Sequence, residues 1–225
     1  MEHIPTELLV FVLQNLQLRK LIELELVNHL FRHLIRNYPW HHVIITLENI
    51  DVISFVIEKY QFKKYNFAYS DITDDIVKNF GNCHTLDLSW CTKITDASLA
   101  HLGKCHIVDL SFCNKITDSG LGYLGNCHTL NLSWCNNITD SGVKHLGDCH
   151  VLDLSSNHKI TDEGAKYLGR CHTLSLYGCY QITDAGIKHL GKCHALNLLN
   201  CPKITAEGAT YLTNCHQVYI QRSLL

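Results

Sequence analysis

The chain has 225 residues, a formal net charge of -2 at pH 7 and 12 cysteines. So small a charge gives no global electrostatic case for binding nucleic acid or an anionic membrane. No apolar run reaches the length of a membrane span, and Glu2 and Glu7 lie where a signal peptide would carry positive charge. We therefore expect an intracellular protein, cytoplasmic or nuclear, that binds neither nucleic acid nor membrane.

Residues 1–43 contain no repeat, and their apolar residues recur at helical spacing. A first run reads Leu8, Leu9, Val12, Leu13 and Leu16, and a second extends from residue 21 to residue 34. Pro5 followed by Thr6 and Glu7 is a plausible helix entry. The pattern predicts two or three short helices that bury one face together. A segment of about 40 residues can bury only a small hydrophobic core, so we expect it to pack against the repeats or against a partner.

The next segment predicts two divergent units at the start of a repeat array. Residues 43–47 read as a strand, and residues 50–57 as a helix. Residues 62–82 form a degenerate repeat, in which Phe62, Tyr65 and Phe67 replace the pattern's Cys, Leu and Leu. Terminal repeats are commonly atypical. Because no Pro/Gly/Ser linker precedes this region, we expect the N-terminal segment and the array to be rigidly joined.

A regular 22-residue repeat begins at residue 83. It is marked by a Cys-His dipeptide whose cysteines are Cys83, Cys105, Cys127, Cys149, Cys171, Cys193 and Cys215. A period of this length, with the frame C-x-x-L-x-L-x-x-C, is typical of leucine-rich repeats. We therefore predict an α/β solenoid over residues 44–225, with degenerate units to about 82, regular repeats over 83–214 and a terminal strand over 215–221.

Each repeat predicts a short strand followed by a short helix. Leu86 and Leu88 alternate as a strand with one buried face. Thr95 then suits a helix N-cap, and Asp96 suits the first turn because it opposes the positive end of the helix dipole. Gly103 and its equivalents are expected to stop the helix.

The cysteines and histidines repeat in phase, which favours a packing role. Neighbouring Cys and His should point to opposite sides and form a ladder with Cys inside and His outside. Asn157 replaces a cysteine at the ninth repeat position, where either residue could hydrogen-bond a buried loop backbone. Such a ladder lacks the four convergent ligands of a structural zinc site and the single activated thiol of a cysteine enzyme. We expect no metal, no cofactor and no catalytic residue.

The outward strand positions should form a concave binding face. Aromatic side chains in three consecutive repeats beside an acidic column predict a target-binding patch made of Asp87, Trp90, Asp109, Phe112, Asn131, Trp134, Asp153 and Tyr177. A basic ligand would relieve the repulsion between neighbouring carboxylates. The alternative is that these are duplicated surface residues, with the aromatic rings tucked over the repeat edge.

The N-terminal segment resembles the F-box motif. The resemblance is carried by Ile4-Pro5-x-Glu7-Leu8, then Leu16, Leu21, Val27, Phe31 and Trp40, with Ile4 in place of the usual Leu and Phe31 in place of Trp. An F-box followed by cysteine-containing leucine-rich repeats defines a family of substrate receptors of SCF-type cullin–RING ubiquitin ligases. The regularity of the repeats is similar to family members carried by large DNA viruses.

The resemblance implies a non-catalytic receptor. Its F-box would dock on a Skp-type adaptor, and its repeats would hold a target protein. The implied adaptor contacts are Ile4, Pro5, Leu8, Leu9, Val12, Leu16, Leu21, Val27 and Phe31. The alternative is a scaffold without ligase function, whose N-terminal helices only cap the solenoid. An exposed apolar surface over residues 4–31 would favour the adaptor, and burial against the repeats would favour the cap.

Overall fold

The computed structural model describes residues 20, 23, 29–37, 40–46, 56, 60 and 62–221. Its strands are β1 (Trp40–Thr46), β2 (Phe62–Asn66), β3 (Thr85–Asp87), β4 (Ile107–Asp109), β5 (Thr129–Asn131), β6 (Val151–Asp153), β7 (Thr173–Ser175), β8 (Ala195–Asn197) and β9 (Gln217–Tyr219). Its helices are α3 (His29–Asn37), α5 (Asp74–Val77), α6 (Asp96–Leu102), α7 (Asp118–Leu121), α8 (Asp140–Val143), α9 (Asp162–Ala165), α10 (Asp184–Ile187) and α11 (Ala206–Ala209), with 3₁₀ turns η2 (Lys78–Phe80) and η3 (Thr210–Leu212).

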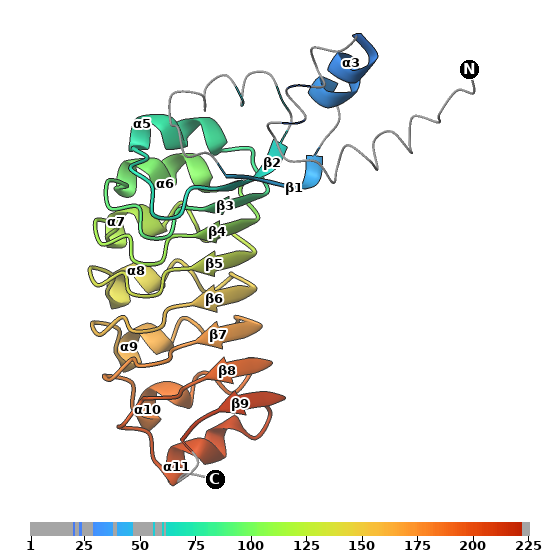
Figure 1. Ribbon diagram of the computed structural model, residues 1–225. Coiled ribbons are helices and arrows are strands. Elements are labelled where there is room, and N and C mark those ends of the chain that lie inside the picture. The colour runs from blue at the N-terminus through green and yellow to red at the C-terminus, as the bar shows by residue number, and fades with distance from the viewer. Residues whose placement is uncertain are drawn as a thin grey trace, which may run out of the picture.

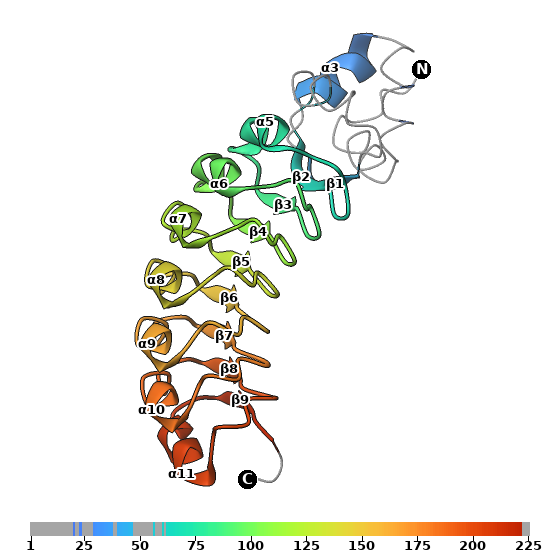
Figure 2. The ribbon, with the colours of Figure 1, turned by 90° about the vertical axis from the view of Figure 1, so that its left-hand side faces the viewer.

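The strands form one parallel sheet in chain order, and the short helices lie along one side of this sheet (Figure 1). Viewed from the side, the stack is an arc with the strands on the concave side and the helices on the convex side (Figure 2). In the described residues, no helix is long and apolar enough to cross a membrane.

The regular repeats stack residue on residue, which confirms the predicted strand and its buried face. Leu86 pairs with Val108 and Val108 with Leu130, and these side chains are at most 1% exposed. Leu88, just after β3, is also fully buried. One continuous hydrophobic core therefore runs the length of the array, and each repeat is stabilised mainly by its two neighbours.

The predicted helix caps are confirmed, and the structure adds a bond between repeats. The Thr95 hydroxyl accepts a hydrogen bond from the N–H of Ala97 in the first turn of α6. The carboxylate of Asp96 reaches the next repeat, where it accepts from the N–H of Thr117 at 2.8 Å and from its hydroxyl at 2.6 Å. The Asp of the repeat is therefore a link between adjacent repeats, in addition to its place at the helix start.

Gly103 directly follows the last residue of α6, as predicted, but its equivalents do not stop their helices, since α7 ends at Leu121 and α8 at Val143. Gly103 has φ -61°, an ordinary helical value that requires no glycine. A Cβ placed on Gly103 would lie 2.6 Å from the carbonyl oxygen of Tyr123. Glycine is needed here because the backbone of the next repeat approaches too closely for any side chain.

The first strand begins earlier than the sequence predicts. The expected strand over residues 43–47 is β1 (Trp40–Thr46), which pairs with β2 through Ile44 and Lys64. β1 therefore spans the position at which we placed the start of the solenoid, and the backbone of Trp40 belongs to the sheet. The β-branched and aromatic residues of this stretch favour a strand throughout.

Most of the N-terminal predictions lie outside the described residues. These are the adaptor residues Ile4, Pro5, Leu8, Leu9, Val12, Leu16, Leu21 and Val27, and the helix expected over residues 50–57 apart from Val56. Phe31 is described only as part of the backbone of α3. In α3, Ile35 is fully buried in the core shared with the repeats, and Leu30 is 42% exposed.

Candidate functional site: the concave face and its two rims

Short strands decide which side chains reach the concave face. Repeat positions are counted from the cysteine of each Cys-His dipeptide. In β3 through β8, the third and fifth positions are half-buried and the fourth is buried. The seventh and eighth positions, expected as outward strand positions, lie instead in the turn that follows each strand. The concave face therefore consists of the third and fifth positions, and the turns form a rim at the carboxyl ends of the strands.

The acidic column on this face has a structural task that the sequence analysis missed. Asp87 Oδ1 accepts from the N–H of Ser89 at 2.9 Å and from its hydroxyl at 2.7 Å. Asp109 and Asp153 hold the following serines in the same way, and Asn131 holds the N–H of Ser133. The carboxylates are consequently fixed in orientation by their own turns, as in an Asx-turn.

The predicted aromatic patch is part of a longer stack along this rim. We call it the aromatic ladder and define it as Tyr69, Trp90, Phe112, Trp134, His158 and Tyr180. Trp90 and Phe112 are stacked with ring centroids 3.9 Å apart, and Phe112 and Trp134 with centroids 5.5 Å apart. At one end Tyr69 stacks on Trp90 with centroids 5.6 Å apart. At the other end His158 meets Trp134 edge-on at 6.2 Å and stacks on Tyr180 at 4.8 Å.

Tyr69, His158 and Tyr180 were not predicted to belong to the site. Tyr69 occupies the eighth position of a degenerate unit, in which the surrounding residues depart from the repeat pattern. His158 and Tyr180 occupy the tenth position, because the eighth position changes to Ser156 and Gly178 in their repeats. In the sequence, only the recurrence of an aromatic residue at either the eighth or the tenth repeat position could have indicated this row.

The first four rings of the ladder are held in a left-handed backbone conformation. Tyr69, Trp90 and Phe112 each have φ 62°, and Trp134 has φ 60°. For a bulky residue this conformation costs about 1–2 kcal/mol. The same turn in later repeats carries Ser156, Gly178 and Asn200, of which glycine and asparagine adopt positive φ most readily. The turn therefore does not require an aromatic residue.

A second ladder runs along the opposite rim, at the amino ends of the strands. It comprises the seven imidazoles of His84, His106, His128, His150, His172, His194 and His216, with adjacent ring centroids 4.4–4.8 Å apart. We call it the His ladder. Loss of hydration within the stack, and then repulsion from neighbouring imidazoles, lowers the pKa of His128 and His172 below its ordinary value.

The cysteines face inward, as predicted. At the ninth position, Cys113 Sγ donates to the carbonyl of Leu88 at 3.1 Å, and Asn157 Nδ2 donates to the carbonyl of Leu132 at 2.8 Å. Asparagine and cysteine therefore satisfy the same buried backbone oxygen of the preceding repeat. Burial raises the pKa of the Cys127 thiol to about 12. In the described residues, no three His, Cys, Asp or Glu side chains converge as metal ligands would.

Tyr177 lies in the turn after β7 and does not join the aromatic ladder. It is 38% exposed, and its hydroxyl accepts a hydrogen bond from Asn200 Nδ2 at 2.6 Å. The predicted target-binding residues thus divide into a fixed polar column, a stacked aromatic rim and this separate tyrosine.

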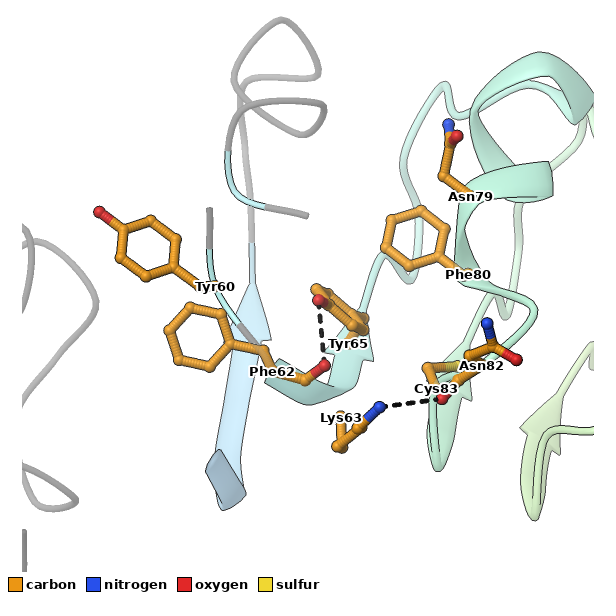
Figure 3. Close-up of a pocket in the computed structure, with 8 residues that line it drawn as sticks. All are labelled: Tyr60, Phe62, Lys63, Tyr65, Asn79, Phe80, Asn82 and Cys83. Carbon is orange, nitrogen blue, oxygen red and sulfur yellow. Dashed lines mark hydrogen bonds between the residues drawn. The ribbon is translucent and has the colours of Figure 1, made fainter. Parts of the chain in front are cut away.

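A hollow of about 260 Å³ lies at the N-terminal end of the array (Figure 3). Its walls include Phe62, Tyr65 and Phe80, and the Tyr65 hydroxyl donates to the carbonyl of Phe62 at 3.2 Å. Lys63 Nζ donates to the carbonyl of Asn82 at 3.4 Å. Burial raises the pKa of the Tyr65 phenol above its ordinary value. The Tyr65 hydroxyl and the Lys63 ammonium are thus bonded to backbone, and the aromatic walls belong to the core.

Stacked strand-and-helix units, a leucine core and a Cys/Asn column together define a leucine-rich-repeat solenoid. The family model described as "Leucine Rich repeat" matches residues 106–125, 128–147 and 150–169. No curated protein sequence is significantly similar to the chain.

Solved structures share the fold at low sequence identity. The yeast Rad7 and Elc1 complex matches with a TM-score of 0.60 and 18% identity, covering 77% of this chain and 52% of that one. Internalin C2 from Listeria monocytogenes matches with a TM-score of 0.58 and 22% identity, covering 80% of this chain and 79% of that one. The internalin InlF from the same organism matches with a TM-score of 0.57 and 22% identity, covering 78% and 53%. The chain thus spans about half the length of the Rad7 and InlF chains.

Proposed function

We propose that this protein is the substrate-recognition subunit of an SCF-type cullin–RING ubiquitin ligase. Residues 1–43 bind a Skp-type adaptor, and residues 44–225 bind a target protein through the concave face. The protein itself does no chemistry. It acts in the cytoplasm or nucleus, and in a host cell if a virus encodes it.

The direct junction between the two parts carries this proposal. Helix α3 ends at Asn37, and β1, the first strand of the solenoid sheet, begins at Trp40. The F-box-like motif therefore leads into leucine-rich repeats without a linker. Ile35 of α3 is buried in the core of the repeats, which supports a fixed orientation between them. A rigid receptor can hold a target near a ubiquitin-carrying enzyme and raise the effective concentration of its lysines.

The Rad7 and Elc1 complex supports a role in a protein assembly. Rad7, whose structure resembles this chain, was solved as a complex with a second protein, Elc1. A solenoid of similar shape can thus be part of a protein–protein assembly.

The competing function is a protein-binding scaffold in which the N-terminal helices only cap the solenoid. Ile35 favours this alternative as well, because a cap also buries an apolar face against the repeats. Leu30, at 42% exposure on the same helix, shows that α3 does not bury all of its apolar residues. The two functions differ in whether the residues before α3 bind another protein.

Capture of a purified Skp-type adaptor–cullin subcomplex by the full chain tests the proposal. The test variant is Pro5→Ala/Leu8→Ala. The matched control is Tyr167→Ala/Tyr211→Ala, which truncates exposed residues of distant repeats. We expect capture by the wild type and the control and its loss in the test variant. A folded wild-type chain that captures no adaptor would leave the scaffold as the better description.

A further inference from the structure

The concave side of the regular repeats carries charges of one sign at neutral pH. Between residues 83 and 221, the segment of each repeat from the His ladder to the turn after the strand contains no lysine or arginine. It contains three carboxylates, Asp87, Asp109 and Asp153. The cations of these repeats follow in the outer loop, helix and return segment, as Lys93, Lys104, Lys115, Lys144, Lys159, Lys166, Arg170, Lys188, Lys192 and Lys203.

The three carboxylates are presented in a fixed orientation. One oxygen of each is bonded to the serine of its own turn. The second oxygen of Asp109 accepts from Asn131 at 2.9 Å, whereas that of Asp87 and of Asp153 has no hydrogen-bond partner in the described part of the chain. Asp87 and Asp109 are paired residues of adjacent strands, so their charges repel by about 1 kcal/mol in water. A cation placed over them relieves this repulsion.

The aromatic ladder supplies an apolar edge beside these carboxylates. From Tyr69 to Trp134 the rings stack face to face, so a partner reaches mainly the ring edges and the indole N–H groups of Trp90 and Trp134. Tyr69 is 75% exposed, and Trp90 and Trp134 are each 42% exposed. An exposed aromatic row held in a left-handed turn that fits smaller residues better is a sign of selection for binding.

Tyr69 argues against simple duplication as the origin of the row. Its unit has Phe62, Tyr65 and Phe67 at the positions of Cys, Leu and Leu in the regular repeat, and it has lost one residue before Ile72. An aromatic residue with the same backbone conformation is nevertheless present at the eighth position.

We propose that the concave face binds an extended protein segment with arginine or lysine side chains over the carboxylates and apolar side chains along the aromatic ladder. This inference rests on the target-binding part of the proposed function and specifies the chemistry of the target. An extended chain directs alternate side chains to opposite sides, which matches a charged column beside an apolar rim. The ladder is about 25 Å long, the length of roughly eight extended residues. An acidic segment would instead meet like charge.

The inference can be tested with three labelled peptides and the full chain. The probe alternates arginine with leucine over the length of the ladder. A second peptide replaces leucine by serine, and a third replaces arginine by glutamate. Fluorescence anisotropy at two ionic strengths measures their dissociation constants. We expect the arginine–leucine peptide to bind tightest and to weaken as salt is added, because salt screens exposed charges.

Substitutions already present in the repeats provide variants that keep the fold. Asp87→Asn/Asp153→Asn preserves the acceptor oxygen of the turn, as Asn131 does naturally, and leaves Asp109 to accept from Asn131. Trp90→Asn/Trp134→Asn places asparagine in a turn that already accommodates Asn200. The matched control, Glu163→Gln/Glu207→Gln, removes two charges from the helical side. We expect each test variant to weaken the arginine–leucine peptide about tenfold and the control to leave it unchanged.

Three results would overturn the inference: no binding of the arginine–leucine peptide, equal binding of the glutamate peptide, or unchanged affinity in the Asp variant. Capture of the adaptor, measured on the same preparations, separates this outcome from failure of the proposed function. The variants lie in the repeats and leave the sequence of residues 1–43 unchanged, so adaptor capture should persist in all of them. Adaptor capture without peptide binding rejects only the inference, and peptide binding without adaptor capture rejects only the ligase.

Discussion

Asp118 and Thr139 lie in adjacent repeats and are joined by two hydrogen bonds through one carboxylate. Oδ1 of Asp118 accepts from the N–H of Thr139 at 2.7 Å, and Oδ2 accepts from its hydroxyl at 2.6 Å. The same threonine hydroxyl accepts from the N–H of Ser141 and caps α8. One carboxylate therefore fixes the start of the next helix, and the pattern recurs from Asp74 to Thr205.

The first prediction removes this link. Asp118→Ala leaves the N–H and hydroxyl of Thr139 without their acceptor, and we expect the free energy of unfolding to fall by about 2 kcal/mol. Urea denaturation followed by circular dichroism measures the loss. Glu163→Ala, at a solvent-exposed carboxylate of a neighbouring helix, is the control and should cost less than about 0.5 kcal/mol. Equal effects of the two substitutions would contradict a structural role for the link.

The second prediction compares two glycines. Gly103→Ala would place a Cβ 2.6 Å from the carbonyl oxygen of Tyr123, whereas Gly122→Ala meets nothing within 4 Å. We expect Gly103→Ala to destabilise the protein by about 1–3 kcal/mol. Gly122→Ala should stabilise it by about 0.5 kcal/mol, because it lowers the entropy of the unfolded chain. Thermal unfolding of both variants is the measurement. A neutral Gly103→Ala would refute close approach of the backbones.

The third prediction concerns the exchange of asparagine for cysteine. Asn157 Nδ2 donates to the carbonyls of Leu132 and Leu154 at 2.8 and 2.9 Å. Asn157→Cys should cost less than about 1 kcal/mol, because a thiol makes the equivalent bond in other repeats. Asn157→Leu should cost about 1–2 kcal/mol, because it removes the amide donor from both carbonyls, which keep only the Cys135 N–H and the Cys179 thiol as donors. Similar stability of the two variants in urea would show that side-chain volume, and not hydrogen bonding, selects this residue.

The fourth prediction concerns pH. Because the pKa of His128 and His172 is lowered in the folded protein, the folded state disfavours their protonated forms. The resulting stability is present above the unfolded histidine pKa of about 6.5 and is lost as pH falls through the folded values. We therefore expect a lower melting temperature at about pH 5.5 than at about pH 7.5, and a smaller difference in His128→Gln/His172→Gln. Equal melting temperatures at both pH values would show that the His ladder does not couple to stability.

The fifth prediction concerns thiol reactivity. Burial raises the pKa of Cys127 and Cys149 to about 12, so neither forms much thiolate at neutral pH. Cys215 is only partly buried, although its pKa is also raised. We expect iodoacetamide to modify Cys215 first in the native protein and the others only after unfolding, as read by mass spectrometry. Early modification of Cys127 would contradict the buried ladder.

The repeated core could be predicted because each residue contacts its own equivalent one repeat away. Leu86, Leu88 and Thr95 therefore reveal their environment through the period alone. The exchange of Asn157 for cysteine likewise identified a buried polar contact, because few tasks suit both side chains.

The turns and close approaches could not be predicted in this way. The left-handed backbone at Trp90 depends on how the strand ends, and the contact that excludes a side chain at Gly103 depends on how tightly the repeats stack. The aromatic ladder continues through His158 because neighbouring loops lie side by side, although their aromatic residues occupy different repeat positions.

By itself, the sequence determined the 22-residue period, the buried columns, the helix caps and the inward-facing cysteines, since these follow from local pattern and repetition. Its F-box motif stays a prediction, because the motif residues before Phe31 lie outside the described residues. Only the tertiary structure decided that the acidic column fixes its own turns, that each Asp links two helices, and that six rings form one rim. Those relationships depend on distances between repeats, which the curvature and spacing of the stacked backbone set.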